Sequence, residues 1–370
     1  MNFAQTLKRC ALTAAMSLCT CAAQAADTDN KLYILNWSDY IAPDTIKNFE
    51  TETGIKVEYV LMDSNEIMEA KLMTGHSGYD IVAPSLHVLK RLSDGGVLEP
   101  LDKSKLPNFK HLDKEKLAKI AEIDQDNTYG IPYMELSTGI GYNKQQVAKA
   151  MGPDFVPDSW DVLFKPEIVS KINQACGVTV LDSASDMICS TLIYLNRDPQ
   201  SPHQEDYEEA QKQLAQMIKN VRYIHSSQYV NDLASGEICL SVGWSGDVQL
   251  AAQRAKEAGL DDIAYVIPKE GALMGYDMFA IPRDAEHKDN AYKFLDYIMR
   301  PEVIAEITNY VRYANANADA TPLVNEDIRN NPGIYFAPEL LERMHIVVPP
   351  ASMERTLTRT WNRVRMEAAD

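Results

Sequence analysis

Apolar runs and amphipathic stretches alternate along the first part of the chain, beginning near residue 32. The continuous apolar run 32–35 predicts a buried strand, and residues 45–53, which end at Gly54, have the spacing of a helix. The alternation continues with strands at 57–61 and 80–83 and helices at 63–75 and 86–94. Because single helices separate the strands, we expect right-handed βαβ units and a parallel sheet covered on both faces.

The later parts of the chain repeat this alternation with other spacings. Strands are predicted at 139–142, 178–181, 238–242, 264–267 and 276–281, and helices at 145–151, 186–195, 207–218, 247–258, 290–299 and 301–310. No linker rich in Pro, Gly or Ser separates two halves, so we expect two lobes joined by crossing strands, at 131–139 and 267–276. The predicted fold class is α/β with two lobes, each a mixed sheet flanked by helices. A ligand would then bind beyond the carboxyl ends of the strands.

The first 26 residues have the features of a signal peptide. Lys8 and Arg9 precede an apolar run that is too short to span a bilayer, and Ala23-Gln24-Ala25 is a small-x-small cleavage pattern. We therefore expect an exported protein, cleaved near Ala25 or Ala26. The predicted domains are a signal peptide at 1–26, a first lobe at 27–133 plus about 276–330, a second lobe at about 137–270, and a C-terminal segment at 331–370 that packs across the lobes.

The composition narrows the class of ligand. Of 370 residues, 36 are Lys or Arg and 53 are Asp or Glu, which gives a formal net charge of -17. So acidic a chain is unsuited to nucleic acid or to an anionic membrane surface, because both bind basic faces. It is suited to a cationic ligand, although acidity can also serve solubility alone.

Three of the six cysteines lie in the signal segment, and Cys176, Cys189 and Cys239 remain. Cys189 shares one side of a predicted helix with Ile193, so we expect it to be a buried free thiol. Cys176 and Cys239 lie next to predicted strands, and export to an oxidising compartment favours a disulfide between them. Closing that loop would stabilise the fold by roughly 4 kcal/mol on a chain-entropy argument. The surroundings of Cys21 match a lipoprotein signal poorly.

The sequence lacks the motifs of catalysis and of cofactor binding. Its seven His are scattered without a zinc-binding spacing, and there is no Gly-x-Ser-x-Gly elbow, Walker loop or Gly-x-Gly-x-x-Gly. We therefore expect a binding protein rather than an enzyme, with no cofactor and no metal.

Aromatic residues stand beside Asp at three predicted strand ends. The pairs are Trp37 with Asp39, Trp244 with Asp247, and Tyr276 with Asp277. An ammonium group that loses its water in a closed cleft needs carboxylates to pair with and aromatic faces over its methylenes. Any one Trp could be a core residue and any one Asp a helix cap, but three such pairs at strand ends indicate a site for an amine.

These segments resemble the periplasmic polyamine-binding proteins of bacterial ABC importers, and most of all the putrescine-binding members. The resemblance is carried by residues 36–43, 84–85, 132–134, 138–143, 225–229, 243–247, 267–271, 313–317 and 320–324. It implies a type II periplasmic binding protein, a monomer that closes on a polyamine and delivers it to an inner-membrane ABC permease. It also supports the Cys176–Cys239 pairing.

The resemblance further implies a set of ligand-contacting residues. By position these are Trp37, Ser38, Asp39, Tyr40, Ser85, Ser226, Trp244, Asp247, Asp277 and Tyr313. Asp39, Asp247 and Asp277 would neutralise ammonium ends. The aromatic members would line the methylene path, and the three serines would accept or relay hydrogen bonds.

The chain departs from the putrescine-binding pattern at several positions that could set selectivity. Ser185 stands in place of a Glu and Gly275 in place of an aromatic residue, while His87 replaces a Ser and Glu135 replaces a Trp. The candidate selectivity residues are His87, Glu135, Asp182, Ser185, Gly275 and Tyr276. These changes leave open putrescine, spermidine, a guanidino-amine such as agmatine, or an ω-amino acid, whose carboxylate a protonated His87 could pair with. A role as a ligand sensor for a signalling partner is also open.

Overall fold

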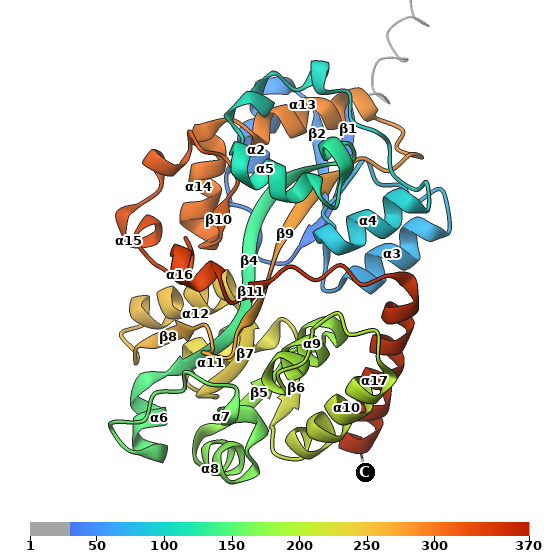
Figure 1. Cartoon of the computed structure of the whole chain (residues 1–370). Coiled ribbons are helices and arrows are strands. Elements are labelled where there is room, and N and C mark those ends of the chain that lie inside the picture. The colour runs from blue at the N-terminus through green and yellow to red at the C-terminus, as the bar shows by residue number, and fades with distance from the viewer. Residues whose placement is uncertain (1–29, 370) are drawn as a thin grey trace, which may run out of the picture.

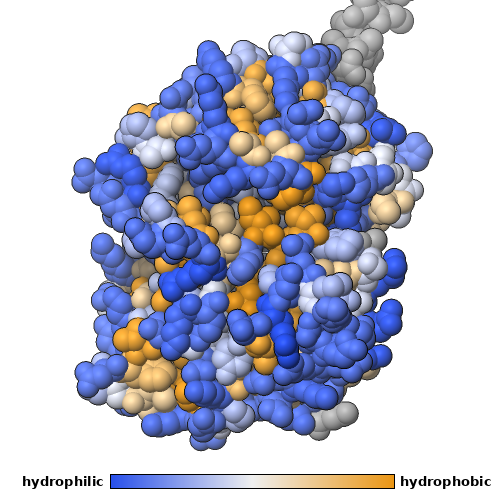
Figure 2. Space-filling view, viewed as in Figure 1, coloured by the Kyte–Doolittle hydropathy of each residue, from blue (hydrophilic) through white to orange (hydrophobic). Residues whose placement is uncertain are grey.

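The computed structural model describes residues 30–369, so the predicted signal peptide lies outside the described residues. Two α/β lobes lie one above the other and share two long strands (Figure 1). Each lobe has a hydrophobic core of its own, one around Leu35 and Phe279 and the other around Ile140 and Val242. On the face shown in Figure 2 the surface is mainly hydrophilic, and hydrophobic residues gather in the band between the lobes. The expected two-lobed α/β architecture is confirmed.

The first lobe is built on a parallel arrangement of three strands. β1 (Lys31–Trp37) pairs in parallel with β2 (Lys56–Met62) on one side and with β3 (Ile81–Val82) on the other. The helices that follow them in turn are α2 (Thr45–Thr53), α3 (Asn65–Met73) and α4 (Leu86–Asp94). Because a central parallel strand is covered on both faces, β1 is a nearly continuous apolar run with Leu32, Ile34 and Leu35 fully buried.

Two antiparallel strands carry the chain between the lobes. β4 (Gly130–Asn143) and β9 (Ala272–Ala280) pair from Gly130 opposite Ala280 to Thr138 opposite Leu273. The strands expected at 139–142 and 276–281 are therefore not separate from the crossings but continuous with them, and each crossing strand is one long element. Nearly every residue of both strands is buried, so no polar break marks where a crossing ends.

The second lobe continues the same sheet. β4 pairs antiparallel with β7 (Leu240–Trp244) and β8 (Ile263–Val266), and β5 (Val178–Val180) lies in parallel between β7 and β6 (Tyr223–Ile224). Its helices are α6 (Lys144–Met151), α7 (Asp161–Phe164), α8 (Pro166–Cys176), α9 (Ala184–Tyr194), α10 (Gln204–Ile218), α11 (Gln228–Ser235) and α12 (Ser245–Glu257). The sequence patterns did not predict α8 or α11.

The chain then returns to the first lobe before it crosses once more. The elements formed after this return are α13 (Lys288–Ile298), α14 (Pro301–Val311), β10 (Ala314–Asn315), α15 (Glu326–Arg329) and α16 (Pro338–Leu341), whereas α5 (Lys114–Ala121) precedes the first crossing. β11 (Met344–His345) adds to β9, and α17 (Ala351–Ala369) packs on α10 and α9 of the second lobe (Figure 1). Leu357, Trp361 and Val364 form the buried side of α17.

A disulfide joins Cys176 at the end of α8 to Cys239 just before β7, with the two Cα atoms 5.4 Å apart, which confirms the expected pairing. Cys189 is a free thiol buried in α9, also as expected. Within residues 30–369 no helix is both long enough and apolar enough to span a bilayer.

Candidate functional site

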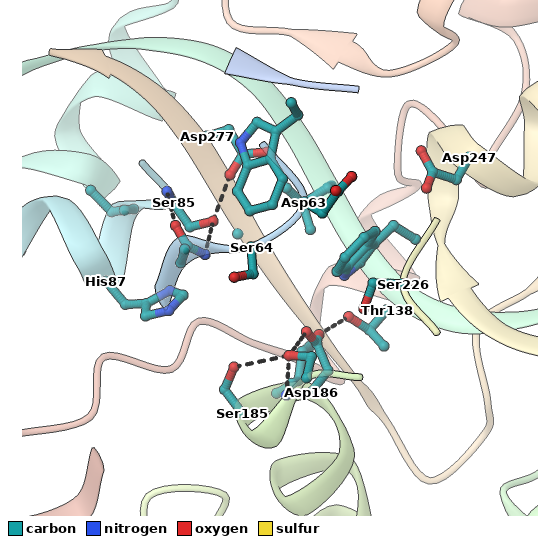
Figure 3. A pocket seen from close by; sticks show the side chains of 18 of the residues that line it. Asp63, Ser64, Ser85, His87, Thr138, Ser185, Asp186, Ser226, Asp247 and Asp277 are labelled. Carbon is teal, nitrogen blue, oxygen red and sulfur yellow. Dashed lines mark hydrogen bonds between the residues drawn. The ribbon is translucent and has the colours of Figure 1, made fainter. Parts of the chain in front are cut away.

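A cavity of about 170 Å³ lies between the lobes, where the chain leaves strands β1, β3, β5 and β7 (Figure 3). All ten residues that the sequence resemblance assigned to ligand contact line it. Five of the six candidate selectivity residues line it as well, and Glu135 does not. Side chains from both lobes therefore face one shared space.

Asp277 lies on β9 and is almost fully buried. Its Oδ1 accepts a hydrogen bond from the Ser85 hydroxyl at 2.7 Å, and its Oδ2 accepts one from the Tyr40 hydroxyl at 2.8 Å. Burial raises the pKa of Asp277 to about 6, and the two hydroxyls offset part of this effect. No salt bridge to Asp277 occurs among the residues that the structure describes, so its charge faces the cavity without a cation.

Asp247, in the first turn of α12, has the same arrangement. Its Oδ1 accepts from the Tyr313 hydroxyl at 2.7 Å and its Oδ2 from the Tyr229 hydroxyl at 2.8 Å. Burial raises the pKa of Asp247 to about 6. Tyr313 packs in the core of the first lobe, so its bond to Asp247 joins the two lobes. The contact is close: a Cβ on Gly246 would lie only 2.1 Å from the Tyr313 ring.

Asp39 differs from these two carboxylates. It follows β1 with a positive φ of 53°, its side chain is half exposed, and its Oδ2 lies 3.2 Å from Nη2 of Arg254 on α12. The neighbouring Ser38 hydroxyl donates to Asp63 at 3.2 Å, and the Ser227 hydroxyl from the second lobe donates to the same oxygen at 3.3 Å. These contacts form the mouth of the cleft and hold the lobes together there.

Aromatic rings line the cavity between the carboxylates. Trp37 from the first lobe meets Trp244 from the second edge to face, with ring centroids 6.4 Å apart. Tyr40 and Tyr313 meet in the same way at 5.0 Å. The Trp37 indole N–H donates to the carbonyl of Ala83 at 2.9 Å, which fixes the orientation of the ring. Apolar ring surface is thus available for the methylenes of an aliphatic ligand.

His87 is half-buried in the cavity wall. Burial, together with the nearby Arg91 guanidinium, lowers the pKa of His87 to about 3, so the ring is neutral near pH 7. The protonated His87 that would pair with a ligand carboxylate is therefore not available. Arg91 also lines the cavity, but it is engaged by Glu69 at 2.9 Å and by Glu354 of α17 at 2.5 Å.

Glu135 was expected near the ligand and lies elsewhere. It pairs with Lys116, and the Tyr276 hydroxyl is 3.5 Å from its Oε1. Side chains alternate between the two faces of a strand, and Leu136 and Thr138 are the β4 residues that face the cavity. Glu135 consequently points to the other face.

The segment that follows β5 supplies two acids. Asp182 accepts from the Trp361 indole at 2.9 Å and lies 3.3 Å from Arg365, so α17 holds it in place. The backbone N–H of Asp182 donates to the Ser226 hydroxyl at 3.1 Å. Asp186, which the sequence patterns indicated only as a helix start, also lines the cavity and accepts from the hydroxyls of Thr138 and Ser183.

Two further residues of the site, Asp63 and Tyr229, were not among the candidate site residues, although Tyr229 lies in the segment 225–229 that carries the resemblance. Asp63 was expected at the start of the helix 63–75, but α3 begins at Asn65 with Ser64 as its cap, and the Asp63 carboxylate lies at the mouth. Among residues 30–369 no group of three or more His, Cys, Asp and Glu side chains is arranged to hold a metal ion.

Comparison with known proteins places this architecture in one family. The family model for bacterial extracellular solute-binding proteins matches residues 44–335. The putrescine-binding periplasmic protein of Escherichia coli is 49% identical over 338 residues, covering 90% of this chain and 91% of that protein. The corresponding protein of Pseudomonas aeruginosa is 45% identical and covers 98% of both chains.

A solved structure gives the same result. The spermidine/putrescine ABC transporter substrate-binding protein of Streptococcus pneumoniae aligns with a TM-score of 0.74 at 26% identity, over 92% of this chain and 99% of that one. The expected class of fold, that of type II periplasmic binding proteins, is thus confirmed. The chain belongs to the family of bacterial extracellular solute-binding proteins.

Proposed function

We propose that this protein captures an aliphatic polyamine in the cleft between its lobes and delivers it to an ABC permease in the inner membrane. The observation that carries the proposal is the pair Asp247 and Asp277. Both carboxylates are enclosed, each accepts two hydroxyl hydrogen bonds, and neither has a basic partner among the described residues. The relatives named above are putrescine-binding and spermidine/putrescine-binding proteins.

These carboxylates favour an amine ligand because burying a charge without a partner costs free energy. Burial disfavours the ionised form of both carboxylates, which is why their pKa values are raised to about 6. An ammonium group beside each carboxylate restores a counter-charge and forms charge-assisted hydrogen bonds. A diamine has one such group at each end and an apolar middle that can lie against the rings of Trp37 and Trp244, which line the cavity.

A ligand with a carboxylate fits less well. The basic residues that line the cavity are His87 and Arg91. His87 is neutral near pH 7, and Arg91 is neutralised by Glu69 and Glu354. An ω-amino acid would therefore bring an unpaired negative charge into a site that already holds several, so we favour a polyamine over an amino acid.

Delivery requires that the cleft open and close. We propose that residues 27–133 with about 276–330 move as one unit and about 137–270 as the other, flexing at β4 and β9, with 331–370 bridging them. In this proposal the chain is exported, cleaved near Ala25 or Ala26, acts as a monomer, and binds its ligand without transforming it. Small-angle scattering of the mature chain should give a smaller radius of gyration with ligand than without.

The test of the proposed function is thermal unfolding of residues 27–370 with candidate ligands at millimolar concentration. A ligand that binds only the native state raises the unfolding midpoint by mass action. We expect putrescine or spermidine to raise it by several degrees. Control ligands of matched length, n-butylamine with one charge and 1,4-butanediol with none, should have little effect. A shift with γ-aminobutyrate or arginine and none with any polyamine would contradict the proposal.

A further inference from the structure

Arg91 lines the ligand cavity and is held by two carboxylates. It lies on α4, and its Nε and Nη2 donate to the two carboxylate oxygens of Glu69 on α3, at 3.1 Å and 2.9 Å. Its Nη1 donates to Oε1 of Glu354 on α17 at 2.5 Å. The three side chains are only 21% to 25% exposed. Of the five N–H groups that a guanidinium carries, three are therefore engaged by acids.

The two acids come from different lobes. Glu69 and Arg91 belong to the first lobe, whereas α17 packs on α10 and α9 of the second. Figure 1 shows α17 beginning beside α3 and α4 and then running along the second lobe. Farther along α17, the Trp361 indole donates to Asp182 at 2.9 Å and ties the helix to that lobe. Glu354 therefore reaches Arg91 from across the cleft.

Helix packing accounts for Glu69 better than for Glu354. The bidentate pair of Glu69 and Arg91 joins α3 to α4 within the first lobe, and Glu354 is not needed for that contact. An acid in the first turn of a helix is favoured by the helix dipole, but this role requires neither burial nor a partner in the other lobe. Burial raises the pKa of Glu354, and the Arg91 charge offsets part of this effect. A second buried acid at the same cation costs free energy that a purely structural contact would not require.

A free guanidinium at this position would change the chemistry of the cavity. Its planar fork of N–H groups matches a carboxylate, with which it forms a bidentate, charge-assisted pair. It would also repel an ammonium group. With Glu69 and Glu354 in place, two negative charges surround the positive charge of Arg91, and Glu66, which lines the cavity, acts on the same guanidinium. A ligand carboxylate that approached Arg91 would therefore meet net negative charge.

We propose that Glu354 is a specificity-determining residue, which withholds Arg91 from ligands that carry a carboxylate and so makes the cleft select amines over ω-amino acids. This inference rests on the proposed function and deepens it, because it names what excludes the competing class of ligand. It also gives the C-terminal helix a role in binding, since the first turn of α17 supplies the acid. Selectivity then comes from blocking the wrong ligand as well as from binding the right one.

Calorimetric titration of residues 27–370 at pH 7.5 with matched ligands tests the inference. Putrescine and 5-aminovalerate share four methylenes and differ at one end, where an ammonium group is replaced by a carboxylate. γ-Aminobutyrate and 6-aminohexanoate are one methylene shorter and longer. We expect the wild type to bind putrescine far more tightly than any of the three amino acids.

Removing the acids should weaken this preference. In Glu354→Gln, the ratio of putrescine affinity to the affinity of at least one ω-amino acid should fall about tenfold or more, because a charge-assisted bond of Arg91 becomes available. In Glu69→Gln/Glu354→Gln it should fall further. Glu367→Gln, which changes an exposed acid on the same helix, is the matched control and should keep the wild-type ratio.

A second measurement assigns the effect to Arg91. If the freed guanidinium binds the carboxylate, Glu354→Gln/Arg91→Gln should lose the gain, and its affinity for ω-amino acids should be no higher than that of the wild type. If the gain reflects only the removal of a negative charge, it should persist without Arg91. Persistence of the gain in the double variant would overturn the inference.

The inference and the proposed function fail in different ways. A wild type that binds putrescine and an ω-amino acid equally well, or an unchanged ratio in Glu354→Gln, would overturn the inference and leave the proposed function intact. A wild type that binds no polyamine would contradict the proposed function itself. Should thermal unfolding show that Glu354→Gln does not fold, Glu69→Gln frees the other side of the same guanidinium. It should lower the ratio in the same direction, and an unchanged ratio there would overturn the inference as well.

Discussion

Asp39 and Arg254 face each other across the mouth of the cleft, with Oδ2 and Nη2 3.2 Å apart. Asp39 follows β1 in the first lobe and Arg254 lies on α12 in the second, so the ion pair forms only where the lobes meet. Asp39 was expected to neutralise an ammonium end, and in this structure it already has a cation. We infer that its main effect is on closure of the cleft rather than on the charge of the ligand.

Replacing Arg254 tests this interpretation. Both side chains are partly exposed, so solvent screens the pair and it is worth only about 0.2–1 kcal/mol. We expect Arg254→Gln to speed ligand dissociation by at most about fivefold, with little change in the association rate, as measured by stopped-flow fluorescence. Lys256→Gln, an exposed residue on the same helix, is the control. A loss of affinity of a hundredfold or more would show that Arg254 does more than stabilise the closed cleft.

Asp247 should have opposite effects on binding and on stability. Asp247→Asn removes an enclosed charge, so it should weaken diamine binding by more than about 1.5 kcal/mol. The unliganded variant should unfold at a higher temperature than the wild type at pH 7.5, because no unpaired carboxylate has to be kept out of water. Calorimetric titration and thermal unfolding measure the two effects. Wild-type affinity in the variant would remove Asp247 from the site.

The raised pKa values predict a pH dependence with a definite sign. Asp247 and Asp277 have pKa values of about 6, above the value of about 3.9 of an unfolded Asp. The native unliganded protein therefore holds more protons than the unfolded chain between these values. Its stability should fall as the pH rises from about 4 to about 6 and then level off.

Ligand affinity should change in the opposite direction over the same range, because ammonium groups need ionised carboxylates. At pH 5 a group with a pKa of about 6 is only about one-tenth ionised. For each carboxylate that contacts the ligand, we therefore expect the affinity at pH 5 to be about tenfold lower than at pH 7.5. Titration calorimetry at several pH values, in buffers of different ionisation enthalpy, should also detect proton release on binding near pH 6. Affinity that is constant from pH 5 to pH 7.5 would contradict this interpretation.

The close approach of Tyr313 to Gly246 predicts that a single methyl group impairs the site. A Cβ at this position would lie 2.1 to 2.4 Å from three atoms of the Tyr313 ring, which is rigid, so Gly246→Ala must displace the ring and weaken its bond to Asp247. We expect ligand affinity to fall about tenfold, the value of one such hydrogen bond to a charged group. Lys256→Ala, an exposed residue on the same helix, is the control. Equal affinities in the two variants would show that the Tyr313 contact does not matter for binding.

The periodic elements of the fold were predictable from the sequence because each is governed by local pattern. α2 and α4 have the expected bounds, and β1 and β2 extend the expected strands by one or two residues at each end. The crossing strands were not predicted as single elements, because their residues are buried along the whole length and show no period. α17 was missed as a helix, since its apolar residues have a partner only after the chain has returned to the second lobe.

The same distinction, between local pattern and contacts of distant segments, separates the site residues that were predicted from those that were not. Residues that follow strands, such as Trp37 and Asp247, could be anticipated because strand ends converge at the cleft. Asp186 was interpreted as a helix start, and nothing local indicates that Thr138, 48 residues away, donates to it. Glu135 was placed near the ligand by the family resemblance, whereas the alternation of β4 turns it to Lys116. The surroundings of both Asp186 and Glu135 are thus set by contacts between segments that are distant in the sequence.

Calorimetric titration of residues 27–370 at pH 7.5 tests whether the cleft binds a polyamine through its buried carboxylates. Spermidine, putrescine or both should bind saturably at one site per chain, and Asp277→Asn should lower the affinity at least about tenfold. Binding of an amino acid, with no heat of binding for any polyamine, would contradict the proposed polyamine site.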